Sequence, residues 1–421
     1  MKVLWLSNVL FPEVCKEINV ATPVVGGWMH SGALNLIACN TNIKLAVATL
    51  YSGKKLICID QYAITYYLIP DQGGNQNYNK ELEEYYKAIT NIFIPDVVHI
   101  HGSEYPHTLA YVKACGVKRV IVSIQGLVSI ISKYYLGGIP IPQIKNNTTL
   151  RDLLRQDTLL IQQEKMRKRG VYEMQLLQSV NHIIGRTSWD QSNVWAINPT
   201  ANYYFCNETL RAQFYKHQWE YEKCKKYSIF LSQAHYPIKG IQKIIEALPI
   251  ILKHYPLTQV YVAGNDFINV PWYRKNGFAN YLEKLMMKFQ VHHHITFLGV
   301  LSESEMVNQY LSANVFVCPS AIENSPNSVA EAQLIGTPCV ASYVGGTMDM
   351  IQDNETGLLY RFEETALLAK HICTIFANKD LAEYISANAR KTAFVRHDKD
   401  NNASRMNEIY NKIINEDVSN L

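Results

Sequence analysis

The sequence predicts an α/β protein with two domains, each built on a parallel, doubly wound sheet. Two observations carry this prediction. The chain has 421 residues, more than one hydrophobic core usually supports. Short apolar strand patterns alternate with helix-length segments along both halves, as in parallel sheets that are covered by helices. The candidate strands are 3–6, 45–49, 97–100, 120–124 and 182–185, then 228–232, 259–264, 295–298, 315–318 and 338–342.

The composition is that of a water-soluble globular protein. Hydrophobic residues make up 48% of the chain and charged residues 18%. No apolar run approaches the roughly 18 residues of a membrane-spanning helix, and the N-terminus lacks the long apolar region of a signal peptide. The nine cysteines are an odd number, form no Cys-x-x-Cys pair and lie mostly in apolar runs. These are features of buried thiols in a reducing compartment, so we expect a cytoplasmic protein.

The formal net charge of +4 is unevenly distributed. Residues 1–186 hold 19 Lys and Arg against 13 Asp and Glu, whereas the remainder holds 21 against 23. A basic half attracts anionic partners. We find neither a nucleic-acid recognition motif nor basic residues interleaved with aromatic ones, so we do not expect nucleic acid as a partner. An anionic membrane at its inner face, or a phosphorylated acceptor, fits the charge.

Two glutamates bracket the most informative stretch of the chain. The apolar strand pattern 314–319 precedes Glu323, and a helical pattern contains Glu331. Ser325 suits the N-cap of that helix and Pro326 suits its first position, where a missing N–H costs nothing. Glu323 is therefore predicted in a loop at the carboxyl end of a strand, and Glu331 about a turn and a half into the next helix.

This helix start is a candidate phosphate site. The carboxyl end of a strand beside a helix N-terminus is where an open α/β sheet binds phosphate, because free N–H groups point outwards there. The start lies around Asn327 and Ser328, with Glu323 before it and Glu331 inside it. Two such carboxylates can hold sugar hydroxyls on either side of a diphosphate. The pattern predicts a nucleotide-sugar site; the alternative is one glutamate in an ordinary loop and one on a solvated helix face.

The stretch from Glu323 to Gly346 resembles the donor-site signature of retaining glycosyltransferase family 4, the group 1 glycosyl transferases. That family has a Glu-x7-Glu pair in a strand, loop and helix, then a Gly-x-Pro-x-Val strand and a Gly-Gly turn. All of these occur here in that order. The resemblance covers residues 228–357 well and the first half only at strand ends. It implies the GT-B fold, in which two Rossmann-like domains face each other across a cleft.

The resemblance also implies roles for three side chains. Glu331 would hold the ribose hydroxyls and Glu323 the sugar hydroxyls on the reacting face. Lys239 would stabilise negative charge as the diphosphate leaves. No metal or other cofactor is implied, since the leaving diphosphate itself helps to deprotonate the acceptor hydroxyl.

Lys239 has independent support from its position. It follows a predicted strand and precedes an apolar helical face, where a point charge can reach a diphosphate. With Gly240 it matches the Lys-Gly motif of the family. The family usually carries an Arg five or six residues earlier, where this chain has Ala234 and Gln233. One positive charge is therefore missing or supplied elsewhere, and Gln233 is kept as a donor-binding candidate.

Strand ends in the first half supply the other candidates. His99 and His101 share one face of a strand, with His101 at its tip. No carboxylate or Cys joins them to complete a metal site, so we predict none. The resemblance places His101 against the donor sugar, with His99 packed in the sheet. Gly26 and Gly27 open a helix, and paired glycines let the backbone approach a donor phosphate.

Further contacts are predicted for both substrates. The backbone near Leu298 and Gly299 would contact the donor. Strand ends are enriched in functional residues, and three residues of the first half are candidates for the acceptor: Trp28, Gln125 and Arg186. The basic run 165–169 closes a predicted amphipathic stretch that begins at Leu150, and it is either a solvated helix end or a contact with a membrane surface.

The domain boundary is placed between about Asp190 and Lys226. The predicted acceptor-side domain comprises residues 1–195 and 403–421, and the donor-binding domain comprises 196–402. The terminal segment is amphipathic, and the resemblance implies that it packs on the first domain. Its apolar residues at helical spacing are Met406, Ile409, Tyr410, Ile413 and Ile414.

These features predict a retaining glycosyltransferase. It would move a hexose from a nucleotide-diphosphate sugar to a saccharide or lipid-linked saccharide in surface polysaccharide biosynthesis. One alternative is a nucleotide-sugar epimerase of GT-B fold, which would turn over donor without acceptor. Another is a non-catalytic nucleotide-sugar-binding partner of a transferase. The missing Arg favours this interpretation.

Overall fold

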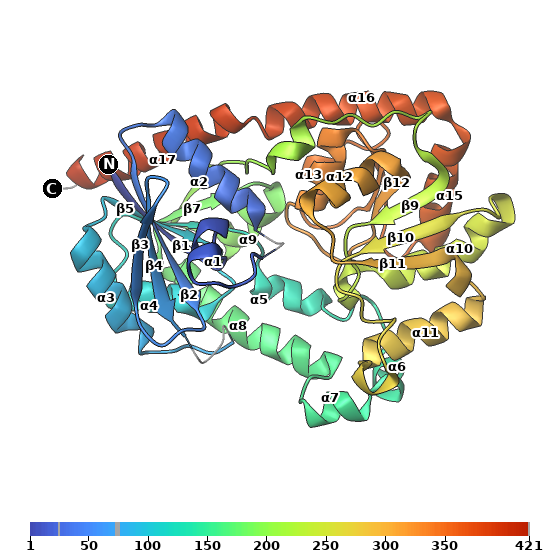
Figure 1. Ribbon diagram of the computed structural model, residues 1–421, viewed down its shortest axis with the longest axis horizontal. Helices are drawn as coiled ribbons and strands as arrows, with labels where there is room; N and C mark the ends of the chain where they lie inside the picture. Colours follow the sequence, from blue (N-terminus) through green and yellow to red (C-terminus); the bar gives the residue numbers. More distant parts are fainter. Residues whose placement is uncertain (24–25, 72–75, 420–421) are drawn as a thin grey trace. The chain divides into compact units, whose positions relative to one another are not determined.

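The computed structural model describes residues 1–23, 26–71 and 76–419 (Figure 1). Its contacts divide the chain into two compact units. The first unit holds residues 1–130, 165–210 and 397–421, and the second holds 131–164 and 211–396. The predicted domains differ from these units in three segments: residues 131–164 belong to the second unit, and residues 196–210 and 397–402 belong to the first. Residues 131–164 contribute no strand, so their pattern gave no indication of the sheet with which they belong.

The first unit contains an eight-stranded sheet in the order β3-β4-β2-β1-β5-β6-β7-β8. Its neighbours pair in parallel, as predicted, except the edge strand β3, which is antiparallel to β4. Tyr62 and Ala63 join β3 and β4 with φ angles of 50° and 65°, as hairpin turns of two residues require. Strands β3, β4 and β8 were not predicted. The strands are β1 Lys2–Ser7, β2 Lys44–Tyr51, β3 Ile57–Gln61, β4 Ile64–Pro70, β5 Val97–His101, β6 Val120–Ser123, β7 His182–Gly185 and β8 Asn202–Phe205.

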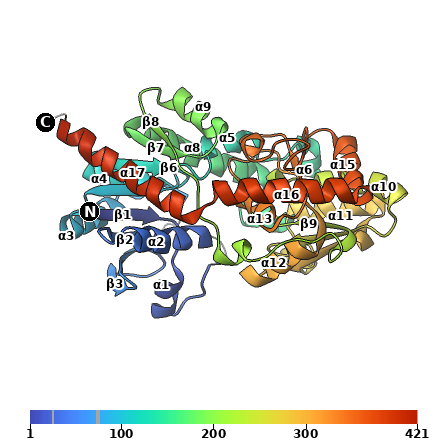
Figure 2. The same cartoon turned by 90° about the horizontal axis from the view of Figure 1, so that it is seen from above.

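Helices cover both faces of this sheet (Figure 2). Successive side chains of β1 point to opposite faces: Trp5 packs with residues of α2 and α17, and Leu4 packs with residues of α3 and α4. Helices α5 and α8 run across the division between the units. The helices are α1 Pro12–Glu17, α2 Gly27–Cys39, α3 Leu82–Phe93, α4 Pro106–Cys115, α5 Val128–Ile131, α8 Leu159–Ser179, α9 Ser188–Ile197 and α17 Lys399–Ser419.

A buried hydrogen-bonded chain fixes the terminal helix α17 to the first sheet. The Tyr410 hydroxyl accepts a hydrogen bond from the Trp5 indole N–H at 2.9 Å and lies 2.6 Å from Nδ1 of His99. Nε2 of His99 lies 2.6 Å from the Ser123 hydroxyl. Burial lowers the pKa of His99 to about 3, so its ring is neutral. Each of its two nitrogens has one hydrogen-bond partner, Tyr410 or Ser123. The expectation that His99 packs in the sheet is confirmed.

The second unit contains a six-stranded sheet in the order β11-β10-β9-β12-β13-β14, with all paired neighbours parallel. Five of these strands were predicted, and β14, which spans three residues, was missed. The strands are β9 Lys225–Leu231, β10 Gln259–Ala263, β11 Ile295–Gly299, β12 Ala313–Cys318, β13 Cys339–Ser342 and β14 Leu358–Tyr360.

The helices of the second unit include α10, whose predicted apolar face is buried at Ile241, Ile244, Ile245 and Leu248. Among the described residues, no helix is both long enough and apolar enough to cross a membrane. The α-helices are α6 Ile141–Asn147, α7 Leu150–Leu154, α10 Ile241–His254, α11 Gly277–Phe289, α12 Glu303–Ser312, α13 Asn327–Ile335, α14 Thr347–Met350, α15 Thr365–Ala377 and α16 Lys379–Arg396. The 3-10 helices are η1 Ser132–Tyr134, η2 Ala212–Tyr215, η3 Pro237–Lys239, η4 Trp272–Arg274 and η5 His292–His294.

Each sheet reverses its strand order once. In the second unit the reversal lies between β9 and β12, and in the first unit it lies between β1 and β5. Loops that leave neighbouring strands on either side of such a reversal diverge, so a crevice opens at the carboxyl ends of the strands. The topology therefore predicts a candidate ligand site at the strand reversal of each unit.

Substitution of Tyr410 by Phe is expected to destabilise the first unit by about 1–3 kcal/mol, because it leaves the buried Trp5 N–H and one nitrogen of His99 without their partner. Urea unfolding would measure the loss. Tyr62→Phe is the matched control, since the Tyr62 side chain is 72% exposed. Equal unfolding midpoints for both variants would show that the buried chain contributes nothing to stability.

Candidate functional site

The loops after β9 and β12 are joined at the reversal of the second sheet. The backbone N–H of Ala321 donates to the carbonyl of Ile238 at 2.8 Å. Gly240 has a φ of 76°, and a Cβ atom there would lie 1.7 Å from the carbonyl oxygen of Pro319. Only glycine satisfies both the left-handed backbone and this close approach. The sequence Lys239-Gly240 is therefore held against the end of β12.

This contact brings Lys239 to Glu323. Nζ of Lys239 lies 2.6 Å from Oε1 of Glu323, and the Ser320 hydroxyl donates to the same oxygen at 2.7 Å. Burial opposes the charge of Lys239, but the adjacent carboxylate outweighs it and raises the pKa of the ammonium group. Both predicted side chains are thus charged, paired and largely buried. Ser320 was not predicted.

The Gly345-Gly346 turn supports Glu323 from the other side. The N–H of Gly346 donates to the backbone carbonyl of Glu323 at 3.0 Å. Gly345 has a φ of 52°, and a Cβ atom there would lie 2.0 Å from the same carbonyl oxygen. The glycine pair of the signature therefore has a structural role, which is to let the turn close on the loop that carries Glu323.

Glu331 lies in α13 and is 7% exposed. Its Oε1 accepts from the Arg211 guanidinium at 2.6 and 3.2 Å, and its Oε2 lies 3.4 Å from the Tyr310 hydroxyl. Burial opposes the charge of both partners: it raises the pKa of Glu331 although Arg211 acts to lower it, whereas at Arg211 the glutamate outweighs burial and raises the pKa of the guanidinium. Arg211 and Tyr310 were missed because neither belongs to a sequence pattern with Glu331; only the fold brings them together.

Helix α13 begins at Asn327, with Pro326 as its N-cap residue and no capping hydrogen bond from a side chain. The prediction of Ser325 as N-cap and Pro326 as the first helical residue is therefore wrong by one position. The φ of Pro326 is −68° and its ψ is 116°, an extended conformation. The Ser325 hydroxyl instead lies 3.6 Å from the sulfur of Met350. Asn327 and Ser328 open the helix as predicted, where N–H groups precede the first intrahelical bonds.

The ends of β9, β10 and β11 also meet. The N–H of Gly264 donates to the carbonyl of Gly299 at 2.9 Å, and a Cβ atom on Gly264 would lie 3.6 Å from Cα of Gln233. Leu298 lies within β11. Gln233 and the buried Ala234 occupy the two positions where the family has its Arg, so neither position carries a cation. His235, which was not predicted, lies at the same edge. Burial and then the charge of Lys239 lower its pKa.

In the first unit, His101 lies at the end of β5 beside the strand reversal. Its ring is buried and stacks on His99 with a centroid distance of 3.8 Å, and it lies tilted against Trp5 at 4.2 Å and against Trp28 at 6.3 Å. Neither ring nitrogen of His101 has a hydrogen-bond partner. Burial keeps its pKa well below the usual range. The ring borders a cavity of 50 Å³ that Trp28 also lines.

The loops after β1 and β5 meet beside His101. The side-chain amide of Asn8 donates to the backbone carbonyl of His101 at 3.4 Å. Gly26 has a φ of 81°, and a Cβ atom there would lie 2.7 Å from Cγ2 of Val9. Gly27 is the first residue of α2. The predicted glycines and histidine therefore share one edge of the first sheet.

The two other acceptor candidates contact each other inside the first unit. The Arg186 guanidinium donates to the carbonyl of Ile124 at 2.6 Å and to Oε1 of Gln125 at 3.3 Å, and it also pairs with Glu208. The arginine is 3% exposed. Its bonds hold the ends of β6 and β7 together, and acceptor binding by Arg186 and Gln125 stays a prediction.

The basic run 165–169 does not end an amphipathic helix. Helix α7 stops at Leu154, and Gln156 has a φ of 48°, which ends the helical path. The run lies in the middle of the separate helix α8.

Within the described residues, no three His, Cys, Asp or Glu side chains are grouped as metal ligands.

Comparisons with known proteins agree on one family for the second half. Residues 213–392 match the model of the family described as glycosyl transferases group 1. An uncharacterized glycosyltransferase of Methanocaldococcus jannaschii is 29% identical over 186 residues, 44% of this chain and 45% of that protein. A phosphatidyl-myo-inositol mannosyltransferase of Mycobacterium leprae is 26% identical over 195 residues, 46% of this chain and 48% of that protein. The chain thus spans less than half the length of these curated relatives.

Solved structures resemble the whole chain. Sucrose-phosphate synthase from Thermosynechococcus elongatus has a TM-score of 0.71 at 16% identity, covering 99% of this chain and 100% of that one. Anabaena HepE, solved in complex with UDP and glucose, has a TM-score of 0.65 at 14% identity, covering 98% of this chain and 100% of that one. At these identities the likeness concerns the fold alone.

Substitution of Gly240 by Ala is expected to lower the stability of the second unit by at least about 1–2 kcal/mol, the cost of a left-handed backbone at a residue with a Cβ atom. The clash with Pro319 adds to this cost. Calorimetry would measure it as a lower melting temperature. Gly32→Ala is the control, because Gly32 is helical and a Cβ atom there meets nothing within 4 Å. A melting temperature as high for Gly240→Ala as for Gly32→Ala would contradict the assigned contact.

Proposed function

Because residues 213–392 belong to the group 1 glycosyl transferases in a chain of GT-B fold, we propose that the protein is a retaining glycosyltransferase. It moves a hexose from a nucleotide-diphosphate sugar to a saccharide or lipid-linked saccharide in surface polysaccharide biosynthesis. The observation that carries the proposal is the Lys239–Glu323 ion pair, which lies at the strand reversal and in the loop that leads into α13.

The donor would occupy the carboxyl edge of the second sheet. Glu331 has acceptor capacity left for ribose hydroxyls, because a carboxylate has about four lone-pair sites and Arg211 and Tyr310 occupy only part of them. The start of α13 and Lys239 face the diphosphate, and the backbone at Gly299 supports the base. UDP and glucose are bound by Anabaena HepE, which shares the fold.

The transfer step needs charge stabilisation more than a catalytic base. The bond between the anomeric carbon and the diphosphate oxygen breaks, and the acceptor oxygen forms a new bond on the same face. The acceptor proton passes to the leaving phosphate. Lys239 stabilises the diphosphate as it takes up the electron pair, and Glu323 positions the sugar hydroxyls. His101 stays neutral because its pKa is low. It can therefore form a hydrogen bond to the donor without adding a charge to the site. No metal enters this scheme.

A non-catalytic nucleotide-sugar-binding protein is the second candidate. Gln233 and Ala234 stand where the family has its phosphate-binding Arg, and weaker stabilisation of the leaving group favours binding without turnover. For the catalytic function we propose a protein of the cytoplasm, peripheral at the inner face of the membrane when its acceptor is lipid-linked.

Glu331→Gln is expected to weaken donor binding at least tenfold, because it removes the charge that accepts from the ribose hydroxyls while it keeps the shape of the side chain. Thermal stabilisation by UDP-, GDP-, ADP- and CMP-sugars would identify the donor class for the wild type and then measure the loss. Glu383→Gln, a change at an exposed carboxylate of α16, is the control. No stabilisation of the wild type by any of these donors would refute the donor site as described.

Lys239→Ala is expected to lower kcat about 100-fold with a smaller change in donor affinity, as for other groups that stabilise a leaving charge. Release of the nucleoside diphosphate in the presence of acceptor measures kcat. Lys253→Ala, at the exposed end of α10, should keep wild-type turnover. Tight donor binding by a wild type that never releases nucleoside diphosphate would favour the non-catalytic candidate.

A further inference from the structure

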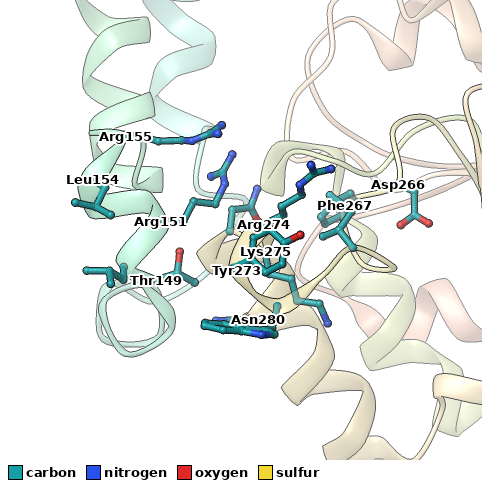
Figure 3. Close-up of a pocket in the computed structure, with 14 residues that line it drawn as sticks. Thr149, Arg151, Leu154, Arg155, Asp266, Phe267, Tyr273, Arg274, Lys275 and Asn280 are labelled. Atoms are coloured by element: carbon teal, nitrogen blue, oxygen red, sulfur yellow. The ribbon is translucent and has the colours of Figure 1, made fainter.

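A hollow of 1090 Å³ lies within the second unit, apart from the pair of glutamates (Figure 3). One wall is α7, and the other is the segment that runs from Asp266 to Asn280 through η4. This segment follows Gly264 at the end of β10, beside Gln233. The segment that forms this wall therefore begins at the same edge of the sheet as the candidate donor site.

The two walls are fastened together at their base by Asp152. This aspartate is 2% exposed. Its Oδ2 accepts from the N–H of Gly277 at 2.6 Å and from the N–H of Thr149 at 3.1 Å, so it joins the first turn of α7 to the start of α11. A Cβ atom on Gly277 would lie 3.0 Å from the same oxygen. The hollow is thus a built feature, because a buried charged group and a close backbone contact fix both of its sides.

The lining has an excess of positive charge. Arg151 pairs with Asp152 at 3.1 Å, and Lys275 pairs with Glu283. In the part of the chain that the structure describes, neither Arg155 nor Arg274 pairs with a carboxylate. Arg151 and Arg155 extend from α7 towards the segment that carries Arg274 (Figure 3).

The acidic residue of the lining does not neutralise this charge. Asp266 accepts from the N–H groups of Ile268 and Asn269 at 3.0 and 2.9 Å, so its carboxylate is bonded within its own turn. Guanidinium groups bind carboxylate and phosphate oxygens in pairs of hydrogen bonds. The unpaired arginines therefore favour an anionic ligand.

Aromatic rings stand exposed beside these cations. The Trp272 side chain is 83% exposed and that of Tyr273 is 58% exposed. Adjacent exposed aromatic rings that line a hollow and are bordered by polar groups are typical of a ligand-binding groove. Flat rings with a polar edge suit the C–H faces of pyranose rings, whose hydroxyls can bond to neighbouring polar groups. Thr149, Asn276 and Asn280 supply such polar groups in the lining.

We infer that this hollow binds an acidic saccharide chain. Arg155 and Arg274 pair with its carboxylate or phosphate groups, and Trp272 and Tyr273 stack on its rings. A concave site of this size has the dimensions of a ligand pocket, roughly 300–1,000 Å³, whereas a bilayer presents a flat surface that cannot fill it. The inference rests on the proposed function only in identifying the bound saccharide as the acceptor or the growing product. Binding of the saccharide does not require glycosyl transfer.

Direct binding to the full-length protein tests the inference without any donor. The acidic probes are hexagalacturonate, which carries carboxylates, and pentamannose phosphate; maltohexaose is the neutral chain. Calorimetric titration should show that at least one acidic probe binds and that maltohexaose does not. Arg155→Ala/Arg274→Ala and Trp272→Ala should each weaken binding at least tenfold. Both variants should keep the wild-type melting temperature, because these side chains are exposed.

Two variants control for general loss of charge and of aromatic surface. Lys253→Ala removes an exposed cation from α10, and Trp195→Ala removes an indole ring that is 68% exposed on α9. Both should bind the acidic probe as the wild type does. Equal weakening by a control and by its counterpart in the hollow would overturn the assignment of the site.

Three further outcomes would overturn the inference. Binding of neither acidic probe excludes an acidic saccharide, and equal binding of maltohexaose excludes recognition of charge. Binding to vesicles of phosphatidylglycerol and phosphatidylcholine, lost in the hollow variants while both acidic saccharides fail, would assign this face to a membrane surface. A failure of nucleotide-sugar binding or transfer would leave these titrations unchanged, so the two proposals fail independently.

Discussion

The close contact between Gly240 and Pro319 is the constraint on which the second unit's site depends. The loops after β9 and β12 leave neighbouring strands and would diverge at the strand reversal. The missing Cβ atom lets the backbone of one loop touch that of the other, and the hydrogen bond between Ala321 and Ile238 secures the contact. Lys239 and Glu323 meet only because these backbones meet.

The ion pair also sets the electrostatics of the candidate site. With Lys239 paired to Glu323 and Arg211 paired to Glu331, each cation is held charged in a largely buried place at the cost of its desolvation. An arriving diphosphate would compete with Glu323 for Lys239 and free this carboxylate for sugar hydroxyls. In the proposed site the two glutamates would therefore have two roles: each pairs with a buried cation, and each would bind hydroxyls of the donor.

Both sheets have one strand reversal, but the side chains at the two reversals differ in chemistry. Both place functional candidates where the strand order reverses, but the edge of the first sheet presents buried neutral rings whereas that of the second presents ion pairs. His101, which is stacked on His99, packed against Trp5 and without hydrogen-bond partners for its ring nitrogens, resists protonation. Residues 149–155 and 266–280 of the second unit together form a third kind of surface, in which arginines and exposed aromatic rings surround a hollow that buried Asp152 fixes in shape.

The sequence by itself determined the alternation of strands and helices, the positions of Lys239 and Glu323 in loops after strands, and the position of Glu331 within the following helix. Apolar periodicity is a local signal, so ten strands were predicted correctly. Strand β14 was missed because three residues are too few to show a period, and the β3–β4 hairpin was missed because its turn has an atypical sequence. The N-cap of α13 was misplaced by one residue, since Ser325 and Pro326 both suit a helix start. Only the tertiary structure decided that Arg211 pairs with Glu331, that segment 131–164 joins the second unit and that its arginines surround a hollow. These are contacts between residues far apart in the chain, and no local pattern encodes which distant side chain will supply a charge.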